Sequence, residues 1–464
     1  MMTDDDLVAR LRAALSDGAV AAAEQINADD LHDESLHPAS GSPVCVVRPR
    51  STAEVIEIVA AARHHGVPIV ARGSGTGLSG AAIPIDGSIL VSFDQMTTIL
   101  DLDVANQVAV IQPGVTLAQL DEALAGTGLR YPVQPGEHSG SLGGNVSTNA
   151  GGMRAVRDGV TRNHVLGLQM VLADGSVLST GGKIVKSSSG YDLTQLVIGS
   201  EGTLALVTEV TVKLSIRYEH SATLVAAFAD LDAVADALPH LSVGGLAPAV
   251  LEYIDALTMA AITRAADIEL SIPASVAEST GAFLVVVLED SSADRLEHDL
   301  EVTASALDAH GAIDTFVLSA HQGPRLIEAR ERAFWVAKAN GATDIVDIVV
   351  PRAEVAPYLA EVGRIAEEHA TFLTGCGHVG DGNVHMSIFE GDPDRRRSLL
   401  DALFSAGLRR GGQISGEHGI GSAKREAYLR HADPVRLELE ARIKEAFDPD
   451  GLFNPTRGGG RRSS

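Results

Sequence analysis

The chain has 464 residues, of which 45% are hydrophobic, and a formal net charge of −25 from 36 Lys and Arg against 61 Asp and Glu. This length is enough for two or three packed domains of the usual ~100–200 residues each, and the composition excludes a disordered protein. The negative charge makes nucleic acid and anionic lipid poor partners, so an anionic ligand needs local positive charge or a metal.

Cys45 and Cys376 are the only cysteines, too few for a disulfide framework and typical of a reducing compartment. The N-terminus, MMTDDDLVAR, is acidic where a secretory signal peptide is basic, and no apolar run reaches the ~18 residues of a membrane span. We therefore expect a cytoplasmic protein with no integral membrane segment. A homodimer is one expected assembly, although the sequence does not decide the oligomeric state.

The chain begins with an expected helical lead-in over residues 1–39, in which residues 6–16 have an amphipathic pattern. A strand is predicted next, at VCVVRP. Ser51 and Glu54 then form a capping-box pattern that opens a helix, and Gly66 ends it. Since another strand, VPIVAR, follows, these residues predict a β-α-β unit.

The first glycine-rich loop, RGSGTGLSG over residues 72–80, contains the dinucleotide pattern G-x-G-x-x-G. A Rossmann unit is nonetheless disfavoured, because Pro84 interrupts the segment where its phosphate-binding helix would run. Residues 87–93 are typical of another strand. The loop therefore lies between strands, and we expect it to bind phosphates through backbone amides and Arg72 in a different nucleotide fold.

The second glycine-rich stretch, PGEHSGSLGGNVSTNAGG over residues 135–152, is the part around which the rest of the chain is organised. It follows a strand, QVAVIQPG, and a helix that begins with the capping-box pair Thr116 and Gln119 and ends at Gly126. Its Gly, Ser, Thr and Asn residues let the backbone approach a ligand and offer free N–H groups, which suits a pyrophosphate. A surface loop without a ligand is the alternative.

The next residues predict a hairpin around Asp174 and Gly175 and then a strand in SEGTLALVTEVTVKL. From Tyr218 the pattern changes to strands, at LVAAF, FLVVVLE, DTFVL and DIVDIVVP, that alternate with helices. The helices are expected to begin at Asp230, Asp294, Pro324 and Arg352. We expect a sheet covered by helices on one face, which would form a cap over the nucleotide.

The last ninety residues concentrate the candidate catalytic side chains. GCGHVGDGNVH places His378 and His385 on either side of a Gly-Asp-Gly-Asn turn, so that both can face one point, and SGEHGIG contains Glu417 and His418. Two His and a carboxylate leave open positions on a divalent ion, as a catalytic metal requires. For any one of these histidines, a structural role is the alternative.

Five spaced motifs carry a family resemblance: RGSGTGLSGAA, PGEHSGSLGGNVSTNAGG, SGYDLTQLVIGSEGTLALVTE, GHVGDGNVH and SGEHGIG. Together they resemble the vanillyl-alcohol-oxidase (PCMH-type) FAD proteins, in the branch of D-lactate dehydrogenases and glycolate oxidase flavin subunits, over residues 40–456. The resemblance implies an α+β fold with a two-subdomain FAD-binding domain over 40–217. An antiparallel α/β cap with the metal site, and a C-terminal helical segment that returns to the flavin, would fill 218–456. Residues 457–464 are expected to be a disordered tail.

The resemblance also implies FAD, with its pyrophosphate between the two glycine-rich segments. In some members of the superfamily a histidine of the first loop bonds covalently to the flavin, but here Thr76 and Leu78 occupy that neighbourhood, so non-covalent FAD is expected. The implied cofactor-binding residues are Arg72, Gly73, Ser74, Gly75, Thr76, Gly77, Ser79, Pro135, Gly136, Gly143, Gly144, Ser147, Asn149, Gly151, Gly152, Glu201, Gly202, Val207 and Asn454.

The implied reaction is oxidation of a small 2-hydroxy acid, D-lactate or glycolate, to the 2-keto acid. A divalent metal (Zn, Mn or Fe) on His378, His385 and Glu417 would bind the substrate, and Arg330 would clamp its carboxylate, although a solvated charged helix face is the alternative for Arg330. His418 would be the general base, and Asn383 would hold the substrate or the His418 ring. The electron acceptor, whether a quinone, an electron-transfer protein, a cytochrome or O₂, is not identified.

Alternative functions are a D-2-hydroxyglutarate dehydrogenase, an oxidase that uses O₂, a flavin-binding subunit without its own turnover, and a metal-dependent hydrolase. Family members that act on 2-hydroxyglutarate place a lysine in the strand that corresponds to DIVDIVVP, where this chain has Ile345, which favours a monocarboxylate. The tail after FNP lacks the Gly-Lys found in relatives. A flavin absorption spectrum would exclude the hydrolase.

Overall fold

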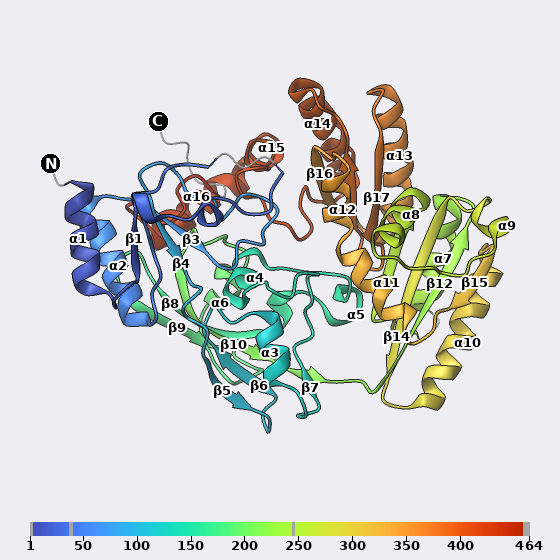
Figure 1. Ribbon diagram of the computed structural model, residues 1–464, viewed down its shortest axis with the longest axis horizontal. Helices are drawn as coiled ribbons and strands as arrows, with labels where there is room; N and C mark the ends of the chain where they lie inside the picture. The colour runs from blue at the N-terminus through green and yellow to red at the C-terminus, as the bar shows by residue number, and fades with distance from the viewer. Residues whose placement is uncertain (1–2, 37–39, 244–245, 458–464) are drawn as a thin grey trace.

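The computed structural model describes residues 3–36, 40–243 and 246–457. Its chain forms two halves that lie side by side (Figure 1). The N-terminal half contains residues 3–217 together with the last residues of the chain, and the cap half contains residues 218–424. Several separate sheets, with helices packed against the larger ones, confirm the predicted α+β fold class.

The first sheet of the N-terminal half has the order β1-β2-β4-β3. Strands β2 (Cys45–Val47), β4 (Ile89–Ser92) and β3 (Ile69–Arg72) are parallel, and β1 (Val20–Ala22) pairs with β2 in the antiparallel sense. Helix α2 (Thr52–His65) connects β2 to β3, which is the predicted β-α-β unit. Helix α1 (Asp4–Ala14) packs against α2, and β1 joins the sheet, so the predicted helical lead-in packs onto this layer.

Helix α2 begins with one of the two capping contacts that its sequence predicts. The hydroxyl of Ser51 accepts the N–H of Glu54, and Gly66 ends the helix in the left-handed conformation. The Glu54 carboxylate does not return to Ser51, however. It accepts the backbone N–H groups of Ser16 and Arg50 at 2.8 and 2.6 Å, and so fastens the segment after α1 to α2.

The second sheet is antiparallel, with the order β5-β6-β10-β8-β9. Its hairpin around Asp174 and Gly175 confirms the sequence prediction. The strands of this sheet, and of the small pair beside it, are β5 (Ile99–Asp103), β6 (Val108–Ile111), β8 (Val165–Val171), β9 (Val177–Gly181), β10 (Leu206–Lys213), β7 (Leu129–Arg130) and β11 (Ser215–Ile216). The helices are α3 (Leu117–Ala123), α4 (Leu142–Thr148), α5 (Ala155–Asp158) and α6 (Leu193–Val197).

Helix α4 was not predicted from the sequence, where residues 135–152 were expected to form a loop throughout. Ser141 caps the helix by accepting the N–H of Gly144, and Asn149 ends it in the left-handed conformation with φ of 53°. Glycine inside a helix usually weakens it. Here it is needed, because a Cβ on Gly143 would lie 2.5 Å from Pro113 Cβ and 2.9 Å from the Pro113 carbonyl oxygen.

The cap half contains a seven-stranded antiparallel sheet with the order β15-β12-β14-β13-β17-β18-β16. Four of its strands were predicted, and β13, β17 and β18 were not. The strands are β12 (His220–Phe228), β13 (Val250–Asp255), β14 (Ala282–Asp290), β15 (Asp314–Val317), β16 (Asp344–Val349), β17 (Leu373–His378) and β18 (Asn383–Ile388).

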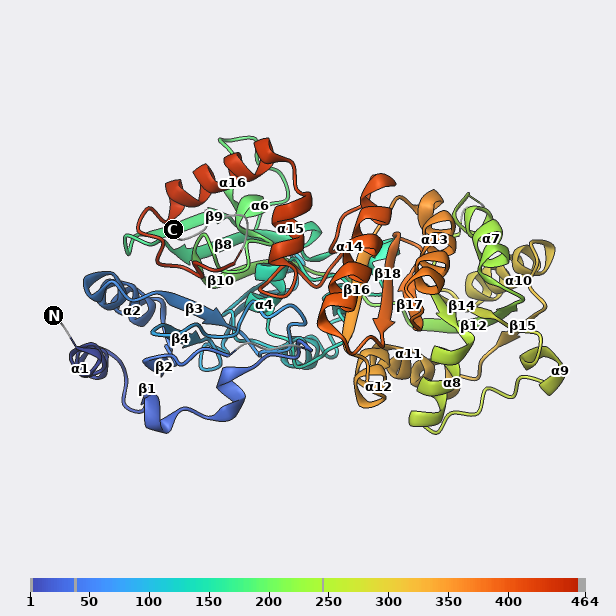
Figure 2. The same cartoon turned by 90° about the horizontal axis from the view of Figure 1, so that it is seen from above.

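Helices cover both faces of this sheet, whereas one covered face was expected (Figure 2). One face packs against α7 (Leu231–Val243), α10 (Ala293–Ala309), α13 (Val355–Glu368) and α14 (Pro393–Arg409). The other face packs against α8 (Ala256–Ala265), α11 (Gln322–Glu331) and α12 (Ala333–Ala339). In this second set α11 corresponds to the helix predicted from Pro324, whereas α8 and α12 were missed because they are short and largely apolar and so show little periodicity.

The C-terminal segment leaves the cap and returns to the N-terminal half. Its helices are α15 (Arg425–His431) and α16 (Pro434–Phe447). Phe453 is fully buried in the core of the first sheet, and Ile69 of β3 donates its N–H to the Leu452 carbonyl at 2.8 Å. Arg457, expected to begin a disordered tail, is instead buried and donates to the Ile83 carbonyl at 2.9 Å; residues 458–464 lie outside the described residues.

Short helical turns complete the described chain: η1 (Ala23–Gln25), η2 (Ala28–Leu31), η3 (Thr161–Asn163), α9 (Ala274–Ala277) and η4 (Arg352–Glu354). Within residues 3–36, 40–243 and 246–457, no helix combines the length and the apolar character that a bilayer crossing requires.

Candidate functional site

A cavity of about 190 Å³, here the glycine-lined cavity, lies between the two glycine-rich segments. Residues 73–79 and 140–151 form most of its walls. The segments come this close because Gly73 has no side chain, since a Cβ there would overlap the Ser141 hydroxyl. A cavity walled largely by backbone, with N–H groups within reach, fits the pyrophosphate of a dinucleotide.

Most of the expected cofactor-binding residues line this cavity. Those that do are Gly73, Ser74, Gly75, Thr76, Gly77, Ser79, Pro135, Gly143, Gly144, Ser147, Gly151, Glu201 and Gly202. Gly136 and Gly152 line a second cavity, described below. Arg72, Asn149, Val207 and Asn454 line neither of the two.

Arg72 was expected to hold a phosphate, and its side chain is committed elsewhere. The guanidinium donates to the backbone carbonyls of Asp29 at 2.8 Å and His32 at 2.6 Å. It therefore fastens the N-terminal segment to the loop, and the backbone amides remain for an anion. This contact was missed because residues 29–32 form a turn whose position depends on the whole sheet.

The other three residues outside the cavities have structural contacts. Asn149 ends α4, and its side chain accepts the N–H of Arg162 at 3.0 Å. Val207 is buried in the core under the second sheet. Asn454 donates from its amide to the Glu201 carbonyl at 2.6 Å, so it supports the turn that contains Glu201.

Glu201 connects the N-terminal half to the segment that carries Glu417 and His418. Its carboxylate accepts the backbone N–H groups of Ile420 at 2.6 Å and Gly421 at 3.0 Å. On the same segment, the His418 carbonyl accepts the Ser79 hydroxyl at 2.9 Å. These contacts hold residues 415–421 against the glycine-lined cavity.

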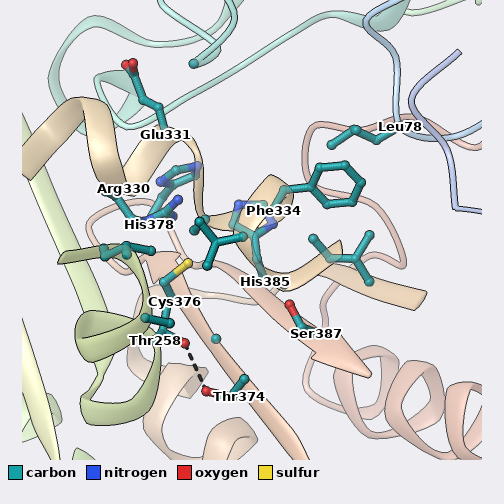
Figure 3. A pocket seen from close by; sticks show the side chains of 18 of the residues that line it. Leu78, Thr258, Arg330, Glu331, Phe334, Thr374, Cys376, His378, His385 and Ser387 are labelled. Carbon is teal, nitrogen blue, oxygen red and sulfur yellow. Dashed lines mark hydrogen bonds between the residues drawn. The ribbon is translucent and has the colours of Figure 1, made fainter. Parts of the chain in front are cut away.

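The histidines come from the hairpin of β17 and β18. His378 pairs with Asn383 across the hairpin, Cys376 pairs with His385, and His385 pairs with Asp347 of β16 on its other side. Because side chains alternate between the faces of a sheet, all five lie on one face. Figure 3 shows His378 and His385 beside Cys376 and Arg330. The predicted meeting of the two histidines thus follows from strand register.

Glu417 completes a compact group with the two histidines. Its Oε1 lies 3.2 Å from Nε2 of His378 and 3.2 Å from Nε2 of His385. These three donor atoms lie within 4.8 Å of one another, as do donors of Asp347, His385 and His418. We refer to His378, His385, Glu417 and His418 as the imidazole–carboxylate cluster. Two imidazoles and a carboxylate are a donor set that fits a divalent cation with open positions.

His418 lies beside the first three members of the cluster. Its ring stacks on that of His385, with centroids 5.1 Å apart and an interplanar angle of 10°. Its Nε2 is 3.9 Å from Glu417 Oε1, and its buried Nδ1 has no hydrogen-bond partner among the described residues. A ring held close to the donors, with unsatisfied nitrogen, is able to exchange a proton with a ligand there.

Buried acids set the charge of the cluster. Burial opposes a charge on His378, but Glu252 and Glu417 outweigh it and raise its pKa well above the usual value. Burial likewise opposes a charge on Glu417, but His378 and His385 hold its pKa well below the usual range. Burial lowers the pKa of His418 to about 4, so its ring is neutral at neutral pH.

Glu252 was missed by sequence reasoning. It is fully buried on β13, and its carboxylate lies 2.5 Å from Nδ1 of His378 and 2.7 Å from Nη2 of Arg330. A carboxylate on the far nitrogen of an imidazole fixes which nitrogen faces a metal. The available signal was a single acid inside the apolar run VLEYI, but β13 itself was not predicted.

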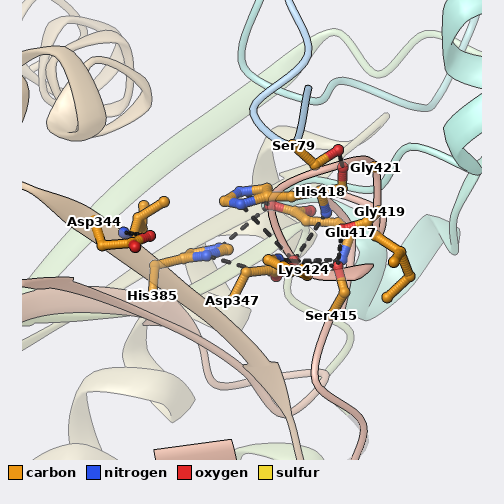
Figure 4. A network of polar contacts seen from close by, with 12 residues as sticks. Ser79, Asp344, Asp347, His385, Ser415, Glu417, His418, Gly419, Gly421 and Lys424 are labelled. Atoms are coloured by element: carbon orange, nitrogen blue, oxygen red, sulfur yellow. Dashed lines mark hydrogen bonds and ion pairs between the residues drawn. The ribbon is translucent and has the colours of Figure 1, made fainter. Parts of the chain in front are cut away.

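Asp347 was also missed, and it organises the segment that carries Glu417 and His418 (Figure 4). Its carboxylate is fully buried and accepts the His418 N–H at 2.9 Å, the Ser415 hydroxyl at 2.6 Å and the Lys424 ammonium at 3.0 Å. Burial opposes its ionisation, but His418 and Lys424 hold its pKa below the usual range. An aspartate at the centre of DIVDIVV was the available signal.

Arg330 and Asn383 have different surroundings. Arg330 is buried and lines the second cavity, and its Nε has no hydrogen-bond partner among the described residues, so a donor remains for a carboxylate. Asn383 lines neither cavity and packs behind the cluster, where a Cβ on Gly416 would lie 2.5 Å from its side chain. A direct substrate contact of Asn383 therefore does not follow from this geometry.

The second cavity, of about 360 Å³ and here the cluster cavity, adjoins the glycine-lined cavity. The residues that line both are Leu78, Pro135, Glu417 and His418. The backbone-walled site and the imidazole–carboxylate cluster are therefore neighbours, with Glu417 and His418 in the wall that the two cavities share.

Comparisons with known families agree with this arrangement. The family described as FAD linked oxidases, C-terminal domain, matches residues 217–457, and the FAD binding domain family matches residues 43–181. The chain belongs to the FAD-linked oxidase family.

Curated relatives match nearly the full length of this chain. It is 50% identical over 450 residues to an uncharacterized FAD-linked oxidoreductase of Mycobacterium tuberculosis, covering 97% of this chain and 98% of that protein. It is 35% identical to the D-lactate dehydrogenase of Archaeoglobus fulgidus, with 90% and 92% covered. It is 34% identical to the glycolate oxidase subunit GlcD of Bacillus subtilis, with 89% and 88% covered.

Among solved structures, p-cresol methylhydroxylase with bound substrate has the same fold. The TM-score is 0.81 at 18% identity, with 98% of this chain and 96% of that chain covered. The vanillyl-alcohol-oxidase type of fold and the lactate and glycolate branch, both inferred from motifs, are confirmed.

Proposed function

We propose that this FAD-linked oxidase converts a 2-hydroxy monocarboxylate, of which D-lactate and glycolate are the smallest members, to the 2-keto acid. The observation that carries the proposal is the wall shared by the two cavities. Glu417 and His418 line both, so a ligand between them touches the cluster and the dinucleotide site at once.

The residues fit both implied groups. The glycine-lined cavity would hold non-covalent FAD, and His378, His385 and Glu417 would hold a divalent metal. When bound, the flavin supplies a hydride acceptor and the metal lowers the pKa of a coordinated hydroxyl. Glu252 supports the metal role of His378, because its carboxylate contacts Nδ1 and leaves Nε2 for the cation.

The protein side chains would bind the substrate and move its proton. Arg330 lines the cluster cavity with a free Nε, which supports a contact with the substrate carboxylate. His418 is neutral at neutral pH, since burial lowers its pKa to about 4, and so can accept the hydroxyl proton. Asp347 would act as a positioning residue, because it holds the backbone N–H of His418.

The charges of the cluster cavity support a monocarboxylate. Among the described residues that line it, Arg330 is the one Lys or Arg, and it already contacts Glu252. Ile345 also lines this cavity and offers no positive charge to a second carboxylate. A dicarboxylate such as 2-hydroxyglutarate would leave one buried charge unpaired, which is costly.

Anaerobic addition of D- and L-2-hydroxy acids to the FAD-loaded protein tests the proposal. We expect bleaching of the flavin absorption by one enantiomer of a monocarboxylate, and loss of the bleaching after chelation of the metal. A protein that stays oxidised with every 2-hydroxy acid contradicts the proposed function. A protein that is colourless after reconstitution with excess FAD favours the metal-dependent hydrolase.

A further inference from the structure

The cluster cavity extends past the cluster along the face of the cap sheet. Strand register places the side chains of this face in successive rows, each about 7 Å beyond the last. The rows are Glu252, His378 and Asn383; then Cys376, His385 and Asp347; then Thr374, Ser387 and Ile345; and then Phe372, directly before β17, and Phe389, directly after β18. The face is therefore charged at the cluster and becomes apolar away from it.

The far part of the cavity, here the apolar arm, combines these last rows with two helices. Its residues are Leu257 and Ile262 of α8, Phe334 of α12, Ile345 of β16, and Phe372 and Phe389. The polar groups beside them are largely used. Thr374 donates to the Asp255 carboxylate at 2.8 Å and is 2.9 Å from the hydroxyl of Thr258. The arm thus offers carbon surface and few free hydrogen-bonding groups.

Two large apolar side chains of the arm remain exposed. Leu257 is 60% exposed and Phe372 is 49% exposed, although the rings of Phe372 and Phe389 are only 5.5 Å apart. Exposed apolar side chains that converge on a cavity mark a binding groove more often than scattered ones do. An apolar ligand in the arm would remove these side chains from water.

The volume of the cavity also favours a ligand that extends into the apolar arm. At about 360 Å³ it lies within the ~300–1,000 Å³ that is usual for clefts that bind ligands of many atoms. Lactate offers a single methyl group, and glycolate offers none. With its carboxylate near Arg330 and its hydroxyl at the cluster, either acid would leave the apolar arm filled with water.

We propose that the preferred substrates are 2-hydroxy acids with an apolar side chain longer than the methyl group of lactate, whether straight, branched or aromatic. This proposal rests on the proposed function and names its substrate class. The carboxylate contacts Arg330, the hydroxyl and C2 lie at the cluster, and the side chain lies between Phe334, Phe372 and Phe389. The row that contains Ile345, with Thr374 and Ser387, determines which substrate side chains fit.

Flavin reduction by a homologous series tests the proposal on the FAD- and metal-loaded enzyme. The probes are glycolate, lactate, 2-hydroxybutyrate, 2-hydroxyhexanoate, 3-phenyllactate and 2-hydroxyglutarate, each as both enantiomers where they exist. We expect the second-order rate constant to rise about three- to fourfold per methylene from lactate to 2-hydroxyhexanoate, and to fall for 2-hydroxyglutarate. Lactate or glycolate matching 2-hydroxyhexanoate overturns the substrate class alone, whereas reduction by no acid overturns the proposed function itself.

Two variants and one matched control locate the effect. Phe372→Ala should flatten the chain-length dependence, and Leu439→Ala, which removes an apolar side chain also 49% exposed but on α16, should keep the wild-type slope. Ile345→Lys should lower the rate with 2-hydroxyhexanoate and raise it with 2-hydroxyglutarate. Flavin content and thermal midpoint are measured for each variant. An unchanged slope in Phe372→Ala, an exposed position that tolerates truncation, overturns the assignment of the arm.

Discussion

The glycine-lined cavity and the imidazole–carboxylate cluster differ in what they are made of. The cavity is walled by the backbone of two continuous segments, residues 73–79 and 140–151, and it depends on side chains that are absent. The cluster is made of side chains from β17, β18 and the segment 415–421, and buried acids behind it set its charge. The first site is therefore damaged by adding atoms, and the second by removing them.

The largest effect is expected when the cluster loses His418. His418→Ala should lower kcat by roughly 10²–10⁴-fold, the usual contribution of a general base, while FAD stays bound. Turnover and flavin absorbance are measured on the same preparation, with His64→Ala on the exposed end of α2 as control. Turnover that survives in His418→Ala removes the residue from the proposed chemistry.

A somewhat smaller effect is expected from the acid behind the cluster. Glu252→Gln would leave Arg330 as a buried cation without a counter-ion, which typically costs about 3–5 kcal/mol, and would weaken a metal on His378 by about 10–100-fold. Metal content after dialysis and the urea midpoint measure the two effects. Glu328→Gln removes a carboxylate from an exposed pair with Arg332 and should cost less than about 1 kcal/mol. An equal loss of unfolding free energy in both variants would contradict the conclusion that Glu252 balances the charge of the buried Arg330.

The junction of the two halves should respond to pH. Glu289 of the cap lies 2.8 Å from Arg154 and 2.7 Å from Arg157 of the N-terminal half. Burial alone would raise its pKa, but the two guanidinium groups lower it to about 2. A lowered carboxylate pKa stabilises the fold above the unfolded value, and this stability disappears as pH falls through the folded value.

Glu289→Gln should therefore cost about 2–3 kcal/mol at pH 7, and the difference from wild type should shrink as pH falls from 4.5 towards 2. Urea unfolding at several pH values measures it. A cost that is constant with pH would show that the carboxylate charge does not stabilise the junction.

The smallest change in stability is expected from alanine substitutions at two helical glycines, one in the wall of the glycine-lined cavity and one outside it. Gly143→Ala places a methyl group against Pro113 and should cost about 1–3 kcal/mol and weaken FAD binding. Gly363 lies on α13 with nothing within 4 Å of an added Cβ, so Gly363→Ala should stabilise by about 0.5–1 kcal/mol. Thermal midpoints and FAD titration compare them. A Gly143→Ala protein that binds FAD normally would show that the cavity does not need its bare backbone.

Local patterns account for what the sequence could predict. The glycine-rich segments, the hairpin at Asp174 and Gly175, and the meeting of His378 with His385 all depend on residues close together in the chain. Glu252 and Asp347 could not be assigned, because their roles require the sheet order β13-β17-β18-β16, which joins strands from distant parts of the chain. The contacts of the Arg72 side chain could not be assigned for the same reason, since its carbonyl partners come from a turn forty residues earlier.

The return of the C-terminus has a consequence for the order in which the protein is made. The edge of β3 and the core beneath it are completed by Leu452 and Phe453, which are synthesised almost four hundred residues after Ile69, their partner in β3. The segment with Glu417 and His418 also emerges late and is fastened to Glu201 of a domain translated long before. Neither cavity can be finished before Glu417 and His418, which line both, have been synthesised. Cofactor loading is therefore expected only after residues 415–453 have folded back onto the N-terminal half, and a flavin assay on chains truncated before residue 415 would test this.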